Sequence, residues 1–560
     1  MRYGPVSSVE RVSLYQLLPR ASFVGCGNVW VRAITADSRA VQAGDVCAVV
    51  SDPLGDGSRH AVEAVARGAV ALIVQRPIAD APVPQCIVAD VRAAYARICQ
   101  ALAGFPARAL RIAGVTGTNG KTTTTWLIRS ILRSAGHSCG VLGTIEYDDT
   151  RTRVPASLTT PDAAVLAAGL QRMRDHEARY AAIEISSHAL DQSRAAGVEL
   201  SAAVVTNVTH DHLDYHGDLE RYRAAKARIL ELCRPDAIVV FDASDPGACE
   251  VVRSAEGGWP LVGVELVDAL DRSGFGMAGP HWKAPGSVPV RAVNDGKVAG
   301  GPLSGVRPKH LMRARVLQQS LDGVVFELHD GHVECLVRWS LLGAHNVFNA
   351  AAAAAVARHW GISWEAIVAG LQEAEAVPGR LERVDGGGPI PVVVDYAHTE
   401  DALRKCLQAL RPVTPGRLLC VFGAGGDRDR EKRPGLARAA QRADVPVVTS
   451  DNPRSEPPER IIAEIMAGFD PDGPPPHVEV DRGAAIRWAI DQARPGDCVV
   501  IAGKGHETYQ IVGEDRRPFD DRQVAREALA EAGLLGNEPA GPTLASRPAA
   551  PHVAASPRHE

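Results

Sequence analysis

A glycine-rich segment around residue 117 constrains the fold of this chain more strongly than any other feature of its sequence. The segment reads Gly114-Val-Thr-Gly-Thr-Asn-Gly-Lys-Thr-Thr123 and lies between an apolar run, 110–115, and a run with helical character, 121–135. A glycine-rich loop between a strand and a helix is the setting of a phosphate-binding loop, because its backbone N–H groups can surround phosphate oxygens at the helix N-terminus. The segment therefore predicts an α/β fold that binds the phosphates of a nucleotide.

The residues inside this loop have separate predicted tasks. Lys121 is expected to reach the β- and γ-phosphates, and the Thr122 hydroxyl is expected to help hold Mg²⁺. The loop is a variant of the usual pattern, because Val115 stands where a glycine normally precedes Gly120 by five residues. The alternative is a glycine-rich turn with a surface lysine, and Gly-Lys-Thr-Thr at a strand-to-helix junction argues against it.

The length of the chain indicates several domains. A chain of 560 residues is expected to form about two to four domains. Strand and helix patterns alternate, which indicates mostly parallel α/β sheets. We predict a first unit over 1–108, a central unit over 109–376, a third unit over 377–535 and a disordered Pro/Ala/Ser-rich tail over 536–560.

Individual elements follow from the apolar runs. The expected strands are 46–50, 70–74, 87–88, 110–115, 181–185, 202–206, 391–394, 418–422, 445–449 and 498–501. The expected helices are 60–67, 121–135 and 346–360. The stretch 255–312 is rich in Gly and Pro and lacks periodicity, so we interpret it as an insertion or a long surface excursion.

Composition excludes several classes of protein. A net charge of −5 argues against a nucleic-acid-binding protein, because neutralising phosphates needs a basic excess. No run approaches the roughly 18 to 20 apolar residues of a membrane span, and residues 1–11 do not resemble a signal peptide. The eleven cysteines are scattered without a CxxC pair, which suits a reducing compartment. We predict a cytoplasmic enzyme, and a monomer because no feature indicates an interface.

Two polar loops in the central unit follow predicted strands. Glu184 ends one strand, and His210, Asp211 and His212 follow the next. A carboxylate and an imidazole on adjacent strand ends could share one hard cation with phosphate oxygens and water. His210, His212 and His216 could also indicate zinc, but no cysteine lies nearby and a phosphate loop lies upstream, so magnesium is favoured. Polar caps on strand ends remain the alternative.

The third unit contains four polar loops, each after a predicted strand. They begin at Asp395, Gly423, Asp451 and Gly503. Ligands of open α/β sheets bind at the carboxyl ends of the strands, so four such loops predict a ligand-binding rim. The rim contains Arg428 and Arg454, and arginine can grip a carboxylate with two hydrogen bonds. An acidic or amino-acid substrate is therefore expected.

Taken together, these motifs resemble those of the Mur ligase family. The resemblance extends from residue 37 to about 531, and the motifs occur in the family's order. They are Asp37-Ser-Arg39, the Gly117–Thr122 loop, Leu158-Thr-Thr-Pro161, Glu184-Ile-Ser-Ser-His188, Asp211-His-Leu-Asp-Tyr-His-Gly217, Gly343-Ala-His-Asn-Val-Phe-Asn349, Pro378-Gly-Arg380, Asp395-Tyr-Ala-His398, Asp451-Asn-Pro-Arg454 and Gly503-Lys-Gly-His-Glu507.

The resemblance implies a fold, an activity and cofactors. The fold would have three domains, with a central P-loop mononucleotide-binding domain and a C-terminal Rossmann-like domain. The enzyme would use ATP and Mg²⁺ to join UDP-MurNAc-L-Ala-D-Glu to a diamino acid, through an acyl phosphate, in peptidoglycan precursor synthesis. The first domain would hold the uridine nucleotide, and the third would close over the central one with the incoming amino acid.

The resemblance also implies roles for matching residues. Those expected at ATP are Gly117, Thr118, Asn119, Gly120, Lys121, Thr122, Thr123, Asn346, Arg380 and Asp395. Those expected at the UDP-linked substrate are Ser38, Thr159, Thr160, Ser186, Gln192 and Arg194. Those expected at magnesium are Thr122, Glu184, His212 and Lys226. The expected catalytic residues are Lys121, Glu184, His212 and Lys226. By its surroundings Lys226 is an ordinary helix lysine, but it matches the lysine that the family carbamylates to N6-carboxylysine.

The resemblance further implies meso-diaminopimelate as the incoming amino acid. In the family, the loop that matches Asp451, Asn452, Pro453 and Arg454 reads the side chain of this substrate. Diaminopimelate has a far carboxylate that lysine lacks, so a pocket built around Arg454 should reject lysine. The remaining residues expected in the pocket are Arg428, Gly503 and Glu507.

Other functions compete with this prediction. The nearest is a sister ligase such as MurF, MurD or folylpolyglutamate synthetase, against which the loops at Asp451 and Gly503 argue. A regulatory protein without catalysis would not need Lys121, Glu184, His212 and Lys226, and a P-loop kinase or transport ATPase would leave the third unit unexplained. The sequence leaves the general base open, with His210 and His212 as candidates. Glu400 stands where the family has proline, at an expected helix start where a carboxylate is tolerated.

Overall fold

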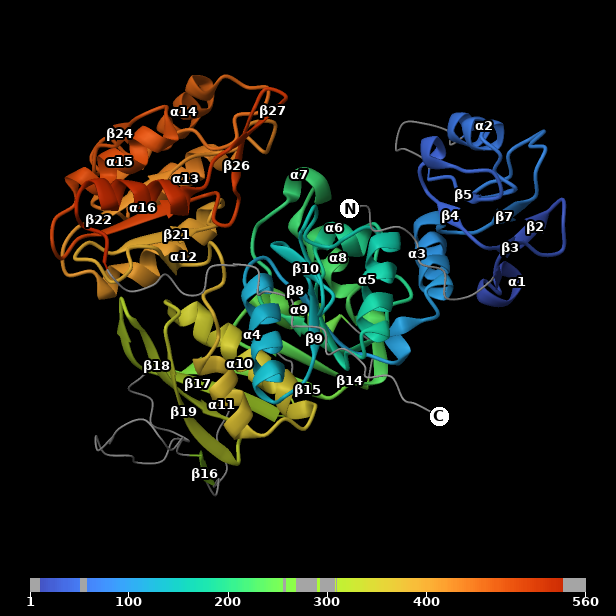
Figure 1. The fold of residues 1–560 in the computed structure, drawn as a ribbon, viewed down its shortest axis with the longest axis horizontal. Coiled ribbons are helices and arrows are strands. Elements are labelled where there is room, and N and C mark those ends of the chain that lie inside the picture. The colour runs from blue at the N-terminus through green and yellow to red at the C-terminus, as the bar shows by residue number, and fades with distance from the viewer. Residues whose placement is uncertain are drawn as a thin grey trace, which may run out of the picture.

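The computed structural model describes residues 11–50, 58–254, 258–267, 290–292, 308 and 310–536. In this part of the chain, the strands form three large sheets that follow one another along the sequence. Figure 1 shows them as three bodies, with the first sheet at the right, the second in the middle and the third at the upper left. The three sheets confirm the predicted α/β fold class.

The first sheet is small and mostly parallel. Its order is β2-β7-β6-β5-β4, and β2 alone runs antiparallel to its neighbour. The predicted strands 46–50, 70–74 and 87–88 are confirmed within a few residues. The elements of this part are β1 (Val12–Ser13), α1 (Leu14–Leu17), β2 (Ser22–Val24), β3 (Trp30–Val31), β4 (Ile34–Thr35), η1 (Ser38–Ala40), β5 (Val46–Ala48), α2 (Ser58–Ala66), β6 (Ala71–Val74), β7 (Gln85–Ile87), α3 (Val91–Leu102) and η2 (Pro106–Arg108).

The described strands of the central part form a twelve-stranded sheet in the order β11-β10-β9-β12-β8-β13-β14-β15-β17-β18-β19-β16. The strands from β9 to β17 in this order are parallel, and both edges are antiparallel. The strands are β8 (Arg111–Thr116), β9 (Cys139–Leu142), β10 (Glu146–Asp148), β11 (Arg153–Pro155), β12 (Tyr180–Glu184), β13 (Leu200–Val205), β14 (Cys233–Asp242), β15 (Leu261–Val267), β16 (Val290–Ala292), β17 (His310–Ser320), β18 (Gly323–His329) and β19 (Val333–Trp339).

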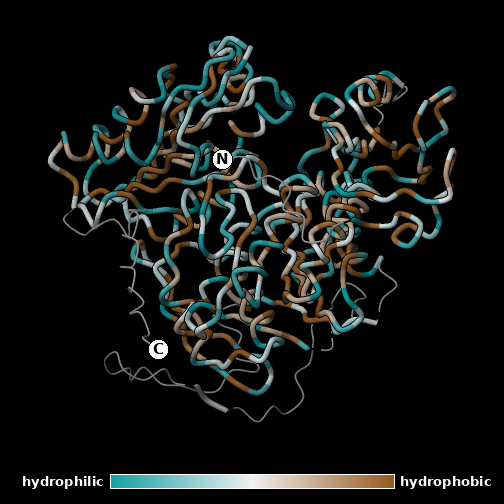
Figure 2. The backbone as a smooth tube through the Cα atoms, turned by 45° about the vertical axis from the view of Figure 1, so that its right-hand side comes forward, coloured by the Kyte–Doolittle hydropathy of each residue, from teal (hydrophilic) through white to brown (hydrophobic). Residues whose placement is uncertain are grey.

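Helices cover both faces of this sheet, which explains why its middle strands are apolar on both sides. One core joins the sheet to α4, α10 and α11, and a second core joins the opposite face to α5, α6, α8 and α9. Figure 2 shows the resulting apolar interior in brown. The helices are α4 (Lys121–Ser134), α5 (Ala163–Asp175), α6 (Ser187–Asp191), α7 (Leu213–His216), α8 (Leu219–Ala227), η3 (Leu230–Leu232), α9 (Pro246–Arg253), α10 (Ala344–His359) and α11 (Trp364–Gln372).

The interpretation of 255–312 as a surface excursion was wrong in part. Strand β15 is parallel to both β14 and β17 inside the sheet, and the strand β16 and the start of β17 also lie in this stretch. The alternation of apolar and polar residues that indicates a strand is missing within β15, because Val262, Gly263 and Val264 are all buried. Residues 255–257, 268–289, 293–307 and 309 lie outside the described residues, as does the predicted tail from residue 537 onward.

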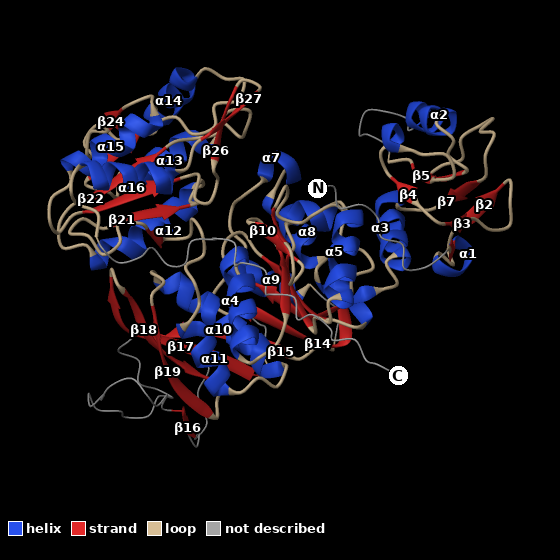
Figure 3. Ribbon diagram, in the orientation of Figure 1, coloured by secondary structure: helices blue, strands red, loops and turns tan. Residues whose placement is uncertain are grey.

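The third sheet is a doubly wound parallel sheet with one antiparallel edge. Its order is β20-β21-β25-β22-β23-β24, and helices lie on both of its faces (Figure 3). The predicted strands 391–394, 418–422, 445–449 and 498–501 are confirmed. The elements are β20 (Glu382–Arg383), β21 (Val392–Asp395), α12 (Glu400–Leu410), η4 (Arg411–Val413), β22 (Leu418–Phe422), α13 (Lys432–Ala440), β23 (Val445–Val448), α14 (Pro458–Met466), β24 (His477–Val478), α15 (Arg482–Gln492), β25 (Cys498–Ala502), β26 (Tyr509–Val512), β27 (Asp515–Pro518) and α16 (Asp521–Glu531).

The state of the cysteines and the apolarity of the helices bear on the predictions made from composition. All eleven cysteines are free thiols, and most of them are buried. Within the described ranges, no helix combines the length and the apolarity that crossing a membrane requires.

The contact between α11 and α4 gives a test of the packing behind the phosphate loop. A Cβ at Gly370 would lie 2.4 Å from the Cα of Ile131, so Gly370→Ala must push the two helices apart and should destabilise the protein by about 1–3 kcal/mol. Urea unfolding followed by circular dichroism measures this. Gly27 is the control, because a Cβ there meets nothing within 4 Å. Equal unfolding midpoints for Gly370→Ala and Gly27→Ala would contradict the close approach.

Candidate active site

The phosphate loop joins β8 to α4 and has the geometry that the sequence predicts. Gly117 and Gly120 have φ values of 146° and 88°, which favour glycine. A Cβ on Gly117 would also lie 1.9 Å from the Thr206 hydroxyl oxygen. Lys121 Nζ donates to the carbonyl oxygens of Gly117 and Thr118, at 2.8 and 2.9 Å. The ammonium group therefore lies over the mouth of the loop.

A buried carboxylate lies beside this loop. Glu184 ends β12 and is 0% exposed. Its Oε2 accepts hydrogen bonds from the hydroxyls of Thr122 (3.0 Å) and Thr144 (2.8 Å), and its Oε1 accepts one from the Thr144 backbone N–H (2.8 Å). Arg380, from the third part of the chain, donates to the Thr122 hydroxyl at 3.2 Å. A carboxylate and a hydroxyl in contact are ligands of the kind that a hard cation takes.

The loop between β13 and α7 places Asp211 and His212 near Lys121. His212 has a φ of 53°, and its Nε2 lies 3.4 Å from an Asp211 carboxylate oxygen. Burial lowers the pKa of His212 to about 4, so its imidazole is neutral at pH 7, the form that binds metals. Burial alone would raise the pKa of Asp211, but His212 and Lys432 hold it below its usual range.

The structure does not gather the three histidines that could have indicated zinc. His210 is exposed, while the rings of His212 and His216 both pack against His188, at centroid distances of 4.8 and 5.5 Å. Among the described residues, no group of three or more His, Cys, Asp or Glu side chains is arranged to hold a metal ion by itself.

Lys226 differs from the exposed helix lysine that its local sequence indicates. It is 1% exposed, and its Nζ lies 4.5 Å from the centroid of the Tyr222 ring. Burial, together with the charge of Lys121, lowers the pKa of Lys226 well below its usual range. No carboxylate of the described chain lies within 4.0 Å of this amine to form an ion pair. Lys226 is thus a buried lysine whose surroundings favour the neutral amine more than a surface position would.

Most residues predicted to contact the UDP-linked substrate form one network next to Glu184. Thr160 donates to the Glu184 carbonyl oxygen at 2.8 Å and accepts from the Ser186 N–H at 2.9 Å. Arg194 donates to the Thr160 carbonyl (3.1 Å) and to Gln192 Oε1 (2.6 Å). The Thr159 hydroxyl accepts from Thr144 at 3.2 Å.

Ser38 lies apart from this network. It belongs to η1 beside the first sheet and donates to Glu63 at 2.7 Å. Figure 1 shows that sheet on the far side of α5 from the phosphate-loop helix. Glu63, which accepts this hydrogen bond, has no motif around it that would have marked it in the sequence.

A cavity of about 240 Å³ lies between the central and third parts of the chain. Seven of the residues predicted at ATP line it: Asn119, Gly120, Thr122, Thr123, Asn346, Arg380 and Asp395. Burial raises the pKa of Asp395, whose oxygens accept the backbone N–H groups of Leu381 and Ala397. Sequence reasoning did not single out other lining residues, among them Asn207, His345, Phe348, Asn349, Tyr396 and Lys405.

The loops predicted to bind the amino acid also meet. Asn452 Nδ2 donates to Glu507 Oε2 at 2.8 Å, and the fully buried Lys504 donates to the same oxygen at 3.0 Å. Gly503 has a φ of 116°, and a Cβ there would lie 2.7 Å from Asp451 Oδ2. Lys504 belongs to a recognised motif, but sequence reasoning did not single it out as a site residue.

Two arginines occupy the rim of this pocket. Arg454 is held by a 2.8 Å hydrogen bond from its Nη1 to the Gly426 carbonyl and has a φ of 52°. Its Nε and Nη2 make no hydrogen bond with the described residues. Arg428 is exposed in the same loop as Gly426. The loops of the third sheet therefore offer both guanidinium groups and the Glu507 carboxylate.

Comparisons with known proteins agree with this geometry. Models of the Mur ligase middle domain and of the Mur ligase glutamate ligase domain match residues 115–258 and 379–505. A UDP-N-acetylmuramoyl-L-alanyl-D-glutamate–2,6-diaminopimelate ligase from Gloeobacter violaceus is 42% identical over 531 residues, which cover 93% of this chain and 99% of that protein. This chain belongs to the Mur ligase family.

Solved structures extend the likeness to the fold of this Mur ligase. A structure of a UDP-N-acetylmuramoyl-L-alanyl-D-glutamate–2,6-diaminopimelate ligase matches with a TM-score of 0.60 and 31% identity, covering 93% of this chain and 99% of that one. MurF from Thermotoga maritima in complex with ADP matches with a TM-score of 0.54 over 90% of this chain and 96% of that one. At 18% identity, this second likeness shows the fold alone.

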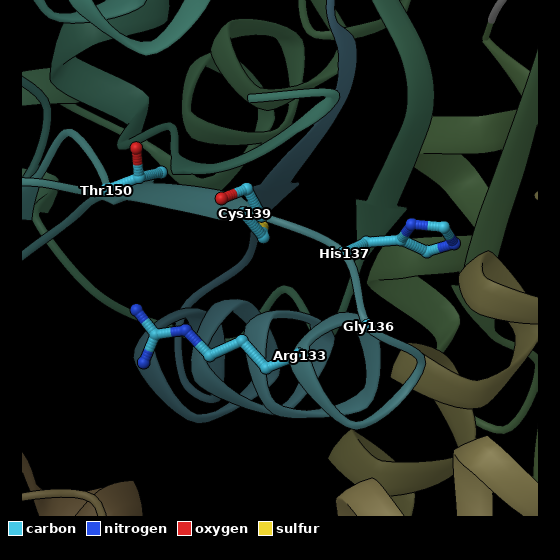
Figure 4. Close-up of a pocket in the computed structure, with 6 residues that line it drawn as sticks. Arg133, Gly136, His137, Cys139 and Thr150 are labelled. Carbon is cyan, nitrogen blue, oxygen red and sulfur yellow. The ribbon is translucent and has the colours of Figure 1, made fainter. Parts of the chain in front are cut away.

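A larger cavity in this Mur ligase lies away from all predicted site residues. It has a volume of about 360 Å³ and is lined by Arg133, Gly136, His137, Ser138, Cys139 and Thr150. Figure 4 shows it at the C-terminal end of α4, with the Arg133 side chain extended along one side and the His137 ring turned to the other. Helix α4 separates it from Lys121 by roughly 20 Å at 1.5 Å per residue.

Gly120 provides a test of the phosphate loop. A Cβ at this position would lie 2.5 Å from Asn349 Oδ1 at a φ of 88°, so Gly120→Ala must displace the loop. A strain of about 1–3 kcal/mol corresponds to a roughly 5- to 150-fold loss of ATP affinity, which isothermal titration calorimetry with ATP and Mg²⁺ measures.

The matched control for this test is Gly136→Ala. Gly136 has a φ of 79° and open space around its Cα, so the control has the same backbone strain without the collision. It should leave ATP affinity unchanged. Equal ATP affinities for Gly120→Ala and the native protein would contradict the assignment of this loop to the nucleotide.

Proposed function

We propose that this Mur ligase adds meso-diaminopimelate to the D-Glu residue of UDP-MurNAc-L-Ala-D-Glu, with ATP and Mg²⁺, during peptidoglycan precursor synthesis. The observation that carries the proposal is the pairing of two sites: a phosphate loop beside a buried carboxylate, and separate loops of the third sheet that hold Arg454 and Glu507. The 42% identity to a relative with the corresponding name supports it.

The first step would activate a carboxylate, because a free carboxylate is a poor acyl donor. The γ-carboxylate of D-Glu would attack the γ-phosphorus of ATP in line, so that an acyl phosphate forms and the bond to ADP breaks. Lys121 and Arg380 would neutralise charge that develops on the phosphate oxygens. The ADP in the solved structure of MurF supports nucleotide use at this site.

The residues near Lys121 fit a magnesium ion. Thr122 and Glu184 supply two oxygen ligands in contact, and His212 supplies a neutral imidazole. When held by these residues, Mg²⁺ would withdraw charge from the phosphate oxygens. The charge of Lys121 lowers the pKa of both His212 and Lys226. Both residues therefore lie near Lys121, which supports one magnesium site made of Thr122, Glu184, His212 and Lys226.

Carbamylation of Lys226 would add a further anionic oxygen ligand to this site. The neutral amine can attack the carbon of CO₂, so that an N–C bond forms and a proton is released to solvent. Burial favours the reactive neutral amine, since it lowers the pKa of Lys226. The resulting carbamate would replace a buried cation beside Lys121 with an oxygen ligand.

The second step would join the amine of diaminopimelate to the acyl phosphate. The amine attacks the acyl carbon, the amide bond forms and phosphate leaves. Arg454 would bind the far carboxylate through its free guanidinium edge, and Glu507 would accept from the far ammonium. Contacts of the third part with the central part, such as Arg380 to Thr122, would keep water from the acyl phosphate.

We propose that the three sheets correspond to domains at 1–108, 109–376 and 377–535. Ser38 would approach the uridine nucleotide in the first domain, and Thr159, Thr160, Ser186, Gln192 and Arg194 would contact the muramoyl-dipeptide. A cytoplasmic monomer that binds neither nucleic acid nor membrane would fit a small, soluble UDP-linked substrate.

The direct test measures phosphate release by the purified protein with ATP, Mg²⁺ and UDP-MurNAc-L-Ala-D-Glu, and identifies the product by mass. Turnover is expected with meso-diaminopimelate and not with L-lysine. Preference for lysine would contradict the assigned acceptor, and a strict requirement for another acceptor would indicate a sister ligase.

The Arg454→Met variant tests the specificity argument in the same assay. Losing a charge-assisted contact with the far carboxylate should lower kcat/KM for meso-diaminopimelate roughly 10- to 100-fold, with little change for lysine. Arg460→Met is the control, because the exposed Arg460 side chain pairs with Glu464 one turn further along helix α14. An equal loss of kcat/KM in both variants would contradict a specific role for Arg454 in binding diaminopimelate.

Chemical rescue tests the carbamate at Lys226. Lys226→Ala should lose at least roughly 100-fold in kcat, and acetate or formate should restore part of it, because a small carboxylate can occupy the vacated space. Lys121→Ala is the control and should not respond to carboxylates, since a cation is missing there. Failure of every carboxylate, or rescue by ammonium ions instead, would count against a carbamate.

A further inference from the structure

Loop 206–212, between β13 and α7, depends on contacts from outside itself. Its last residue, His212, has a left-handed φ of 53°, a conformation that a non-glycine residue keeps only when neighbours hold it. On one side the loop is tied to the phosphate loop: the Thr118 N–H donates to the Asn207 carbonyl at 2.8 Å, and the Thr209 N–H donates to the Thr118 hydroxyl at 3.0 Å.

On its other side, two residues from the third part of the chain reach this loop. Asp401, in the first turn of α12, accepts from the Thr209 hydroxyl at 3.3 Å and from Asn119 Nδ2 at 3.4 Å. Lys432, the first residue of α13, donates to Asp211 Oδ1 at 2.8 Å. The two helices thus contact the same loop next to His212.

The Lys432–Asp211 ion pair is shielded enough to have structural weight. The side chains are 23% and 8% exposed, whereas pairs on the open surface contribute little because water screens them. A second carbonyl or carboxylate partner for Lys432 is not found among the described residues, so its ammonium is committed to the central part of the chain.

The neighbouring residue, Arg433, points the other way, into the third part. It is 1% exposed and donates to Glu456 at 2.8 Å and to the Gly425 carbonyl at 3.2 Å. Gly425 lies in the loop of Arg428, and Glu456 follows the loop of Arg454. The first turn of α13 therefore touches both amino-acid-binding loops through Arg433 and loop 206–212 through Lys432.

We propose that Lys432 is a positioning residue that sets the geometry of loop 206–212 from the third part of the chain, and so couples the amino-acid pocket to the phosphoryl-transfer site. This inference rests on the proposed function for its effect on catalysis. Lys432 contacts no reacting atom in the proposed reaction. Its role is to hold Asp211, and through Asp211 the adjacent His212, in place while the third part is docked on the central part.

The catalytic test compares Lys432→Met with the native enzyme. The rate of amide formation should fall roughly 10-fold, because small misplacements of catalytic groups have large effects. The ratio of phosphate released to amide formed should rise above its stoichiometric value, because looser docking admits water to the acyl phosphate. Lys432→Arg should recover most of the native rate and the native ratio, since arginine can also pair with Asp211.

A second measurement does not require the proposed reaction. In the full-length protein, hydrogen–deuterium exchange of a peptide covering 206–216 should become roughly 10-fold faster in Lys432→Met. Arg438→Gln is the matched control on the same helix, because Arg438 pairs only with the exposed Glu400; it should change neither readout. An unchanged exchange rate in Lys432→Met overturns the inference, whereas an inactive native protein with faster exchange in the variant overturns only the proposed reaction.

Discussion

The organisation of the central site depends on one anion that water does not reach. Glu184 is fully buried at the end of β12, and a buried carboxylate is strongly unfavourable unless hydrogen bonds and nearby cations compensate. Thr122 from the phosphate-loop helix and Thr144 from the turn after β9 provide the hydrogen bonds. Lys121 provides a nearby positive charge. Segments distant in sequence must therefore converge before this carboxylate becomes tolerable.

The same requirement links the central sheet to the third one. Arg380, which precedes the third sheet in the sequence, donates a hydrogen bond to Thr122. Its guanidinium group also lies over the ring of Tyr396, in the loop that follows β21. The nucleotide cavity is lined from both sides. The amino-acid rim, in contrast, is built from loops of the third sheet alone. The structure thus keeps the polar loops of the third sheet apart from the phosphate loop and joins the two parts through a few side chains, among them Arg380 and Lys432.

Much of this could be predicted from the sequence, because the phosphate loop and the four polar loops of the third sheet are local signals at strand ends. Other features could not. Lys226 lies in α8, whose sequence looks solvated, and it becomes buried only where that helix packs against α6, α7 and α9. Strand β15 pairs with β14 and β17, and that pairing spans the poorly patterned stretch after residue 267. The Lys432–Asp211 pair joins positions more than two hundred residues apart, and nothing in either local sequence indicates it.

The cavity between the central and third sheets has a consequence for inhibition. Because its wall combines Asn346 and Phe348 from α10 with Tyr396 and Lys405 from the other side, it exists in this form only while the two parts are docked. A compound that fills it would contact both parts and stabilise their docked arrangement. Its rate of dissociation would then depend on how often the two parts separate. Under the proposed assignment of this cavity to ATP, such a compound would compete with the nucleotide while it holds the two parts of the chain together.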